Sequence, residues 1–371
     1  MSASGNININ SHQNQNPDPD VSIYPRLSDQ DAPYSIEETL LRSVIFIPAG
    51  FKFGQDGKTP VILVPGTGSY GGENYGQNLA KLLAASSFGD PVWLNVPGRM
   101  CNDASKNAEY AAYAINYIAT RCRKKVATVG WSQGNISIQW SLKYWPSTRD
   151  QVSNFIALSA DFRGSVMARV LVPFKATQPA APAVWNQTPH SNFIAALRSN
   201  GGDSAYVPTT SIYSAVDEAV QPQYGAGASA LMKDERNVGV TNCQLLGTPS
   251  LWKPAGQGYS HDGVLLSPVT WALTEDAIKN GGPGRIDRID MSTVSWRRKT
   301  SGLSLCDASR TRTVSLRCLM HILTFTPKLW DEPALPLYAT AEKNVAVAAA
   351  EEDIVVPPNE SVGVLKLKSK L

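Results

Sequence analysis

The pentapeptide at 130–134, which reads Gly-Trp-Ser-Gln-Gly, constrains the fold of this 371-residue chain more than any other feature. It follows an apolar run at 126–129 that is typical of a buried strand. It precedes 135–144, where apolar and polar residues mix as in a helix. Between a strand and a helix, Gly-x-Ser-x-Gly forms a turn so sharp that only small residues fit beside the serine. With 28 glycines in the chain the pentapeptide alone is weak, and the flanking pattern is what predicts an exposed nucleophile at Ser132.

A serine hydroxyl needs a base to take its proton, and the chain has four histidines. In folds built around this turn, an acid and then a histidine follow the serine along the chain. His12 lies in a polar tail, and His190 follows Ser132 with no strand-end acid clearly ahead of it. His321 lies in an apolar stretch, which is more typical of a hydrogen-bonded core histidine. His261 lies in a glycine-rich loop after a late strand, so its placement favours it as the base.

The orienting acid is expected to end a strand between the serine and the histidine. Residues 210–216 alternate like a strand and run directly into Asp217 and Glu218, and Gln221-Pro222 closes the turn. Asp217 comes first past the strand and is predicted to accept a hydrogen bond from the histidine ring. Glu218 is the nearest alternative, and a solvated acidic turn is the other interpretation.

Acyl transfer also needs donors directed at the developing oxyanion. The backbone N–H of Gln133, directly after the nucleophile, is one such donor. A second is expected from the glycine-rich loop 66–72, which follows the apolar strand pattern at 59–65. This loop lacks both Gly-x-Gly-x-x-Gly spacing and a P-loop lysine, so nucleotide binding is not expected.

Three stretches, 60–68, 131–134 and 214–222, resemble signatures of the fungal lipase B family. Shorter matches such as Gln139-Trp140 and 161–164 lie between them, so the resemblance covers roughly 60–280 with its motifs in order. It implies an α/β-hydrolase fold, with a mostly parallel central sheet and helices on both faces. It also implies ester hydrolysis, or acyl transfer to alcohols, without a metal or organic cofactor.

The resemblance also implies roles for individual residues. Its catalytic triad falls on Ser132, Asp217 and His261, the residues that placement along the chain already favours. Its oxyanion donors fall on Thr67, through backbone and hydroxyl, and on the backbone of Gln133. Three further positions match residues that line the family's pocket, and each could instead serve packing alone: Trp131, Asp161 and Gln187.

The motifs that must converge are spread widely, which favours one domain at 34–340. Residues 1–33 are rich in Asn, Gln, Ser, Asp and Pro and predict a disordered tail. Residues 164–185 are apolar but broken by prolines, as expected of a pocket wall or flap, or of a buried connecting loop. A second cap segment is expected within 300–340, and 341–371 reads as a peripheral tail.

The net charge of +3 is mild and implies no nucleic-acid partner. We expect a monomer that acts on a lipid or ester small molecule, with transient contact with a lipid surface. The family is usually secreted, yet no secretory signal is recognisable at the start of the sequence, so the compartment stays open. Five cysteines leave at least one unpaired, and none precedes Cys101 to form the family's N-terminal bridge. Cys243 looks like one of the family's bridged positions, with Cys306 as a possible partner.

Past residue 285 the resemblance fades, which keeps a second hypothesis open. In it, the chain is a non-catalytic, lipid-binding relative whose C-terminal region fails to complete the pocket. Among enzymes, an esterase or acyltransferase for soluble esters is a further alternative.

Overall fold

The computed structural model describes residues 8–172 and 178–340, so the tail predicted at 341–371 lies outside the described residues. These residues form a seven-stranded sheet with the order β1-β3-β2-β4-β5-β6-β7. All neighbouring strands pair in parallel except β1, which runs antiparallel to β3 at one edge. The strands are β1 (Ile45–Phe46), β2 (Thr59–Val64), β3 (Gly89–Leu94), β4 (Val126–Trp131), β5 (Val152–Leu158), β6 (Thr209–Tyr213) and β7 (Val240–Gln244).

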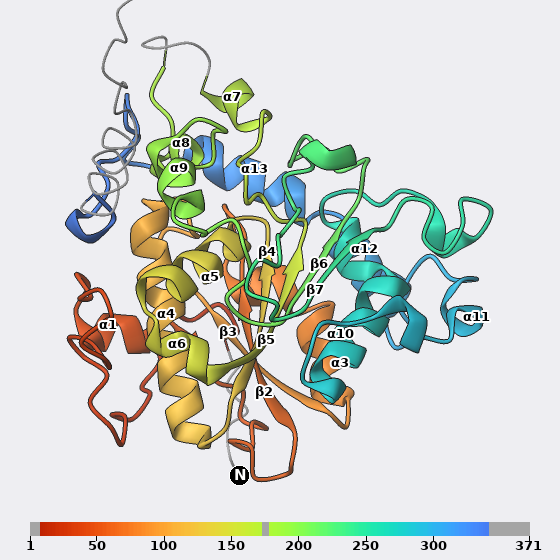
Figure 1. Cartoon of the computed structure of the whole chain (residues 1–371), viewed down its shortest axis with the longest axis horizontal. Coiled ribbons are helices and arrows are strands. Elements are labelled where there is room, and N and C mark those ends of the chain that lie inside the picture. The colour runs from red at the N-terminus through yellow and green to blue at the C-terminus, as the bar shows by residue number, and fades with distance from the viewer. Residues whose placement is uncertain (1–7, 173–177, 341–371) are drawn as a thin grey trace, which may run out of the picture.

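Helices cover both faces of the sheet, which is why the central strands β2 and β4 are buried along almost their whole length and do not alternate with exposed polar residues. In β2, Val61 and Leu63 belong to one buried cluster, and Ile62 and Val64 belong to the other. One face carries α4 (Ala104–Cys122), α5 (Gln133–Tyr144) and α6 (Ser147–Gln151), and the other carries α3 (Leu79–Ala85), α10 (Pro268–Asn280) and α12 (Leu305–Thr311) (Figure 1). This is the α/β-hydrolase architecture that the sequence predicts.

The chain after His261 forms two helical segments and not one continuous helix. A short 3-10 helix, Gly263–Leu266, ends before Ser267, whose hydroxyl accepts the Thr270 N–H at 3.3 Å and starts α10. Pro268 at the first helical position cannot donate a backbone hydrogen bond, so the chain restarts there rather than continuing. Gly281, with φ +65°, ends the helix.

Residues 8–33 differ from the disordered tail that their composition predicts. Ile23 is fully buried, and the indole N–H of Trp93 donates to the Ile9 carbonyl at 2.8 Å. The Asn16 amide donates to the carbonyls of Arg42 and Ile45, at 2.9 and 2.7 Å. The amide side chains that suggested disorder instead satisfy backbone carbonyls of the domain. Residues 1–7 lie outside the described part.

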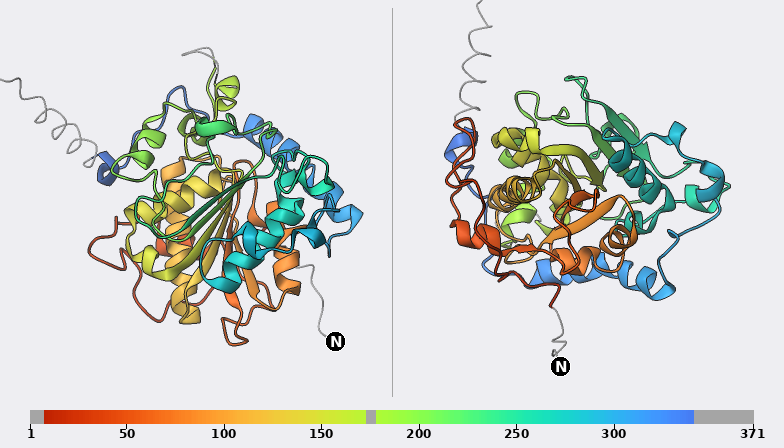
Figure 2. Two further views of the ribbon diagram at one scale, coloured as in Figure 1. Left: turned by 45° about the vertical axis from the view of Figure 1, so that its right-hand side comes forward. Right: turned by 90° about the horizontal axis from the view of Figure 1, so that it is seen from below.

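Three helices, which we call the roof, lie over the carboxyl ends of the strands: α7 (Ala168–Leu171), α8 (Pro182–Asn186) and α13 (Val314–Thr324) (Figures 1 and 2). The predicted flap 164–185 contributes α7 and α8, except for residues 173–177, which are not described. Within 8–172 and 178–340, every helix is too short or too polar to cross a bilayer. The remaining helices are α1 (Glu38–Ser43), α2 (Gly71–Tyr75), α9 (Asn192–Arg198) and α11 (Met291–Val294), with 3-10 turns at Gly225–Gly227, Pro254–Gly256 and Ile286–Arg288.

Candidate active site

Ser132 occupies the turn between β4 and α5 with φ +55° and ψ −129°, a conformation that few non-glycine residues adopt. The flanking glycines explain how the chain turns so sharply. A Cβ on Gly130 would lie 2.5 Å from Asn135 Oδ1, and a Cβ on Gly134 would lie 2.2 Å from the carbonyl oxygen of Val64. The pentapeptide therefore forms the strand-turn-helix elbow that its flanking pattern predicts, at the carboxyl end of β4.

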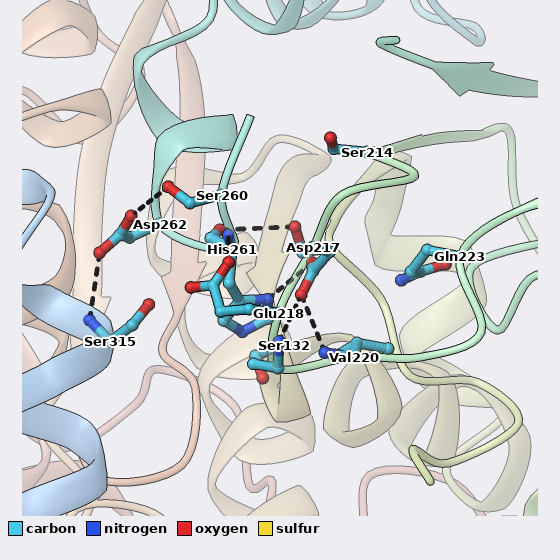
Figure 3. Close-up of polar contacts among 12 residues, drawn as sticks. Ser132, Ser214, Asp217, Glu218, Val220, Gln223, Ser260, His261, Asp262 and Ser315 are labelled. Carbon is cyan, nitrogen blue, oxygen red and sulfur yellow. Dashed lines mark hydrogen bonds and ion pairs between the residues drawn. The ribbon is translucent and has the colours of Figure 1, made fainter. Parts of the chain in front are cut away.

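His261 and Asp217 meet at the end of β6. His261 Nδ1 lies 2.8 Å from Asp217 Oδ2, and both side chains are almost fully buried (Figure 3). The other carboxylate oxygen of Asp217 accepts the backbone N–H groups of Ala219 and Val220, at 2.9 and 2.8 Å. Because the acid holds Nδ1–H, the lone pair of the neutral ring lies on Nε2, the nitrogen that can accept a proton.

The neighbouring acid has a different role. Glu218 Oε2 accepts the backbone N–H of His261 at 2.9 Å, so it holds the loop and not the ring. Trp131 holds the same residue from the other side, because its indole N–H donates to the His261 carbonyl at 2.9 Å and its ring lies 4.5 Å from the imidazole. Of the two acids considered from the sequence, Asp217 is the one that contacts the imidazole.

Two opposing influences act on the pKa of His261. Burial disfavours the charged ring and lowers the pKa, whereas the charge of Asp217 and its hydrogen bond raise it. Glu218 and Asp262 raise it further, and the net direction is upward from the ordinary value. The ring is therefore a stronger base than a free histidine. When pH falls through this raised pKa, the ring is protonated and can no longer accept a proton from the serine.

Ser132 and His261 line the same pocket, and Figure 3 shows the serine beside the imidazole. Among the hydrogen bonds of residues 8–172 and 178–340, none joins the Ser132 hydroxyl to the ring. Hydrogen bonds between nucleophile and base are often long or misaligned until substrate binds. The geometry thus fixes the acid–base pair and brings the nucleophile to the same cavity.

The loop after β2 lies beside the elbow, as predicted. Thr67 Oγ1 is 2.7 Å from Gln133 Nε2 and 2.9 Å from Gln187 Nε2, which both donate to it. The Thr67 hydroxyl also has an acceptor within the protein, because Oγ1 lies 3.2 Å from Gln187 Oε1, so it can donate to a ligand only by giving up this bond. The backbone N–H groups of Thr67 and Gln133 donate to no hydrogen bond within the described residues. These three donors are the ones expected for an oxyanion.

The pocket has a volume of about 460 Å³, within the usual range for small-molecule sites. Most of its lining is apolar and comes from the roof. Its polar lining includes the residues predicted from the sequence: Thr67, Trp131 through its indole, Ser132, Asp161, Gln187 and His261. Asp161 is fully buried, and neither carboxylate oxygen has a hydrogen-bond partner within the described chain. Burial raises the pKa of Asp161 to a net value of about 7, with the charge of His261 lowering it and the charge of Asp217 raising it by smaller amounts.

Other observations differ from the sequence predictions or extend them. All five cysteines are unpaired, so the bridge suggested between Cys243, which is buried in β7, and Cys306, which is exposed on α12, is absent. His321 is not in the core. It lies half-buried on α13, with Nδ1 2.7 Å from the Gly68 carbonyl oxygen. Asn107, whose amide donates to Gln133 Oε1 at 2.8 Å, was missed because a polar residue within a long helix carries no distinguishing signal.

The chain is similar to known fungal lipases. It is 40% identical over 165 residues to lipase B of Pseudozyma antarctica, a match that covers 44% of this chain and 47% of that protein. The match therefore spans about half the length of that relative. The crystal structure of Aspergillus fumigatus lipase B superposes with a TM-score of 0.85 and 46% identity, covering 90% of this chain and 79% of that one. No profile of a known protein family matches the chain.

Proposed function

Because this chain belongs to the lipase B family of α/β-hydrolases, we propose that it is a serine hydrolase that cleaves carboxylic esters of lipid-like substrates. The observation that carries the proposal is the buried pair of His261 and Asp217, which opens into the same cavity as the strained Ser132. A strained nucleophile, a base with a raised pKa and unused backbone donors are together what acyl transfer requires.

In the proposed reaction, Ser132 Oγ attacks the ester carbonyl while its proton passes to His261 Nε2. The negative charge that forms on the carbonyl oxygen is stabilised by Thr67, through its N–H and hydroxyl, and by the N–H of Gln133. The imidazolium, held by Asp217, then gives its proton to the departing alcohol and leaves an acyl-enzyme on Ser132. Attack by water, activated by the same histidine, releases the acid, and attack by an alcohol would give ester exchange. No step uses a metal or an organic cofactor.

The shape and lining of the pocket support a lipid-like acyl group. Its wall is formed largely by apolar side chains of α7 and α13, and it continues to exposed apolar residues such as Val170 and Leu316, which are 66% and 62% exposed. Exposed apolar side chains around a pocket mouth favour contact with a lipid surface. All residues assigned to the reaction come from one chain, which supports action as a monomer.

A fluorophosphonate probe, which reacts with an activated serine, tests the proposal directly. We expect the wild type to be labelled and to hydrolyse a nitrophenyl ester, and Ser132→Ala to do neither. Ser137→Ala is a matched control, because Ser137 is buried on the same helix and its hydroxyl has no hydrogen-bond partner in the described chain. Labelling that survives Ser132→Ala, or a folded wild type that is not labelled, would contradict the proposal.

The alternatives make different predictions. A non-catalytic lipid-binding relative was suggested by the weak resemblance past residue 285, yet α13, which lies in that region, lines the pocket. That hypothesis predicts retention of lipid without turnover. An esterase for soluble substrates would reach its full rate on dissolved ester and gain nothing when the ester aggregates. A lipase would gain rate once the ester concentration is high enough for aggregation. Added alcohol distinguishes an acyltransferase by the appearance of a new ester.

A further inference from the structure

Helix α13 packs directly against the loop that holds Thr67. Gly68 adopts φ +85°, and a Cβ at this position would lie 2.4 Å from the carbonyl oxygen of Cys318 and 2.7 Å from its Cα. The backbones of the loop and the helix therefore approach so closely that a residue larger than glycine fits only if the helix moves. Any displacement of α13 would leave this side of the loop uncovered.

Both backbone polar groups of Gly68 are hydrogen-bonded. Its N–H donates to the carbonyl of Arg99 at 2.7 Å, and its carbonyl accepts from His321 Nδ1, also at 2.7 Å. The first bond fixes the peptide between Thr67 and Gly68, and the second fixes the peptide that follows. Of the two partners, His321 is the one that α13 supplies, and it acts through a side chain that a substitution can remove.

The same helix is also attached to the histidine loop. Near its start, the Ser315 N–H donates to Asp262 Oδ2 at 3.3 Å, and the other oxygen of Asp262 accepts the Ser260 hydroxyl at 2.7 Å (Figure 3). Asp262 directly follows His261. One helix thus contacts the loop of the base near its start and the oxyanion loop near its end.

We propose that His321 is a positioning residue for the oxyanion hole, a role that rests on the proposed function. By donating Nδ1–H to the Gly68 carbonyl, it holds the backbone next to Thr67 and so directs the Thr67 N–H and hydroxyl at the reacting oxygen. It does not touch the substrate in this role. The neutral ring donates this bond from the tautomer that carries its proton on Nδ1.

Kinetics of three variants test the proposal. Removing one oxyanion donor costs about 10²–10³ in kcat, so a displaced donor in His321→Ala is expected to lower kcat about tenfold with little change in KM. His321→Asn keeps an N–H donor close to the place of Nδ1 and should recover most of the loss. His190→Asn, an exposed histidine with the same substitution, should match the wild type. An unchanged kcat in a folded His321→Ala, or no recovery in a folded His321→Asn, would overturn the proposal.

The ¹⁵N spectrum of the ring gives a readout that is independent of turnover. We expect the neutral form of His321 to carry its proton on Nδ1, with its signals assigned as those lost in His321→Asn. A proton on Nε2 would overturn the proposal whatever the kinetics. If the wild type shows no Ser132-dependent turnover while the Nδ1–H signal is present, the proposed function fails and the contact between α13 and the loop remains.

Discussion

Beneath the pocket, Ser132, Asp161 and Asp217 follow the ends of β4, β5 and β6, and we call this region the floor. Above it, two helices of the roof, α7 and α13, bury only a few of their residues. All twelve residues of α5, the helix that follows the nucleophile, are buried. Of the eleven residues of α13, only Val314 and Cys318 are. A strand end surrounded by packed neighbours can hold a side chain precisely in place, and a helix with two buried residues depends on a few specific contacts.

This difference explains why the resemblance to the lipase B family is strong in one region of the chain and fades past residue 285. The signature stretches lie in the floor and in the two loops beside it, where the proposed reaction requires side chains and N–H groups at fixed positions. The roof past residue 285 needs only to supply apolar surface of the right shape, which many sequences can do. The molecule thus separates the groups proposed to react from the apolar surface proposed to contact the substrate.

The largest expected effect tests whether the floor alone sets the chemistry. Asp217→Asn keeps the shape of the side chain but removes the charge that holds the Nδ1–H tautomer, so kcat should fall by about 10⁴-fold. Glu218→Gln retains an oxygen that can accept the His261 N–H, and kcat should stay within about tenfold of the wild type. Ester hydrolysis measured for both variants provides the comparison. Equal losses in the two variants would contradict the assignment of the acid.

A smaller effect tests how well the roof keeps water from the floor. The pKa of Asp161 is about 7 in the folded protein, against an ordinary value of 3.8. The folded state therefore holds a proton that the unfolded state has lost, and stability falls as pH rises from about 4 to 7. At pH 9, Asp161→Asn should be more stable than the wild type by up to about 4 kcal/mol, and at pH 4 by almost nothing. Urea unfolding at both pH values measures this. If the difference in unfolding free energy between Asp161→Asn and the wild type is the same at pH 4 and at pH 9, water reaches the Asp161 carboxyl and the roof is open.

The smallest expected effect compares two glycines whose Cβ would meet backbone. Gly134→Ala places a methyl group against the Val64 carbonyl in the sheet, which cannot move, and should cost about 3 kcal/mol or more. Gly68→Ala meets Cys318 on α13, which can shift, and should cost about 1–2 kcal/mol for its positive φ. Urea midpoints give the stabilities. If Gly68→Ala loses as much stability as Gly134→Ala, or more, the roof is as rigid as the floor.

Much of the fold and of the floor could be predicted from the sequence, because local patterns determine both. Apolar runs bounded by turns locate the strands, and the order serine, acid, histidine selects Asp217 and His261 among the alternatives. The role of His321 could not be predicted, since its partner is the Gly68 carbonyl, 253 residues away. Its apolar neighbours suggested a core histidine, yet Leu316, Met320 and Leu323 are exposed at the roof. The packing of residues 8–33 could not be predicted either, because a segment whose side-chain amides hydrogen-bond to the domain has the same composition as a disordered tail.

The packed segment at 8–33 has a practical consequence for the edge of the sheet. The outermost strand, β1, has two residues, and the Asn16 amide donates to the Ile45 carbonyl there. An uncovered strand edge is a template for pairing with other molecules. A version of this protein shortened past Asn16 and Ile23 would present both an open edge and a bare apolar hollow, and would be prone to aggregate during expression. Affinity tags are therefore better joined ahead of residue 8 than substituted for the segment.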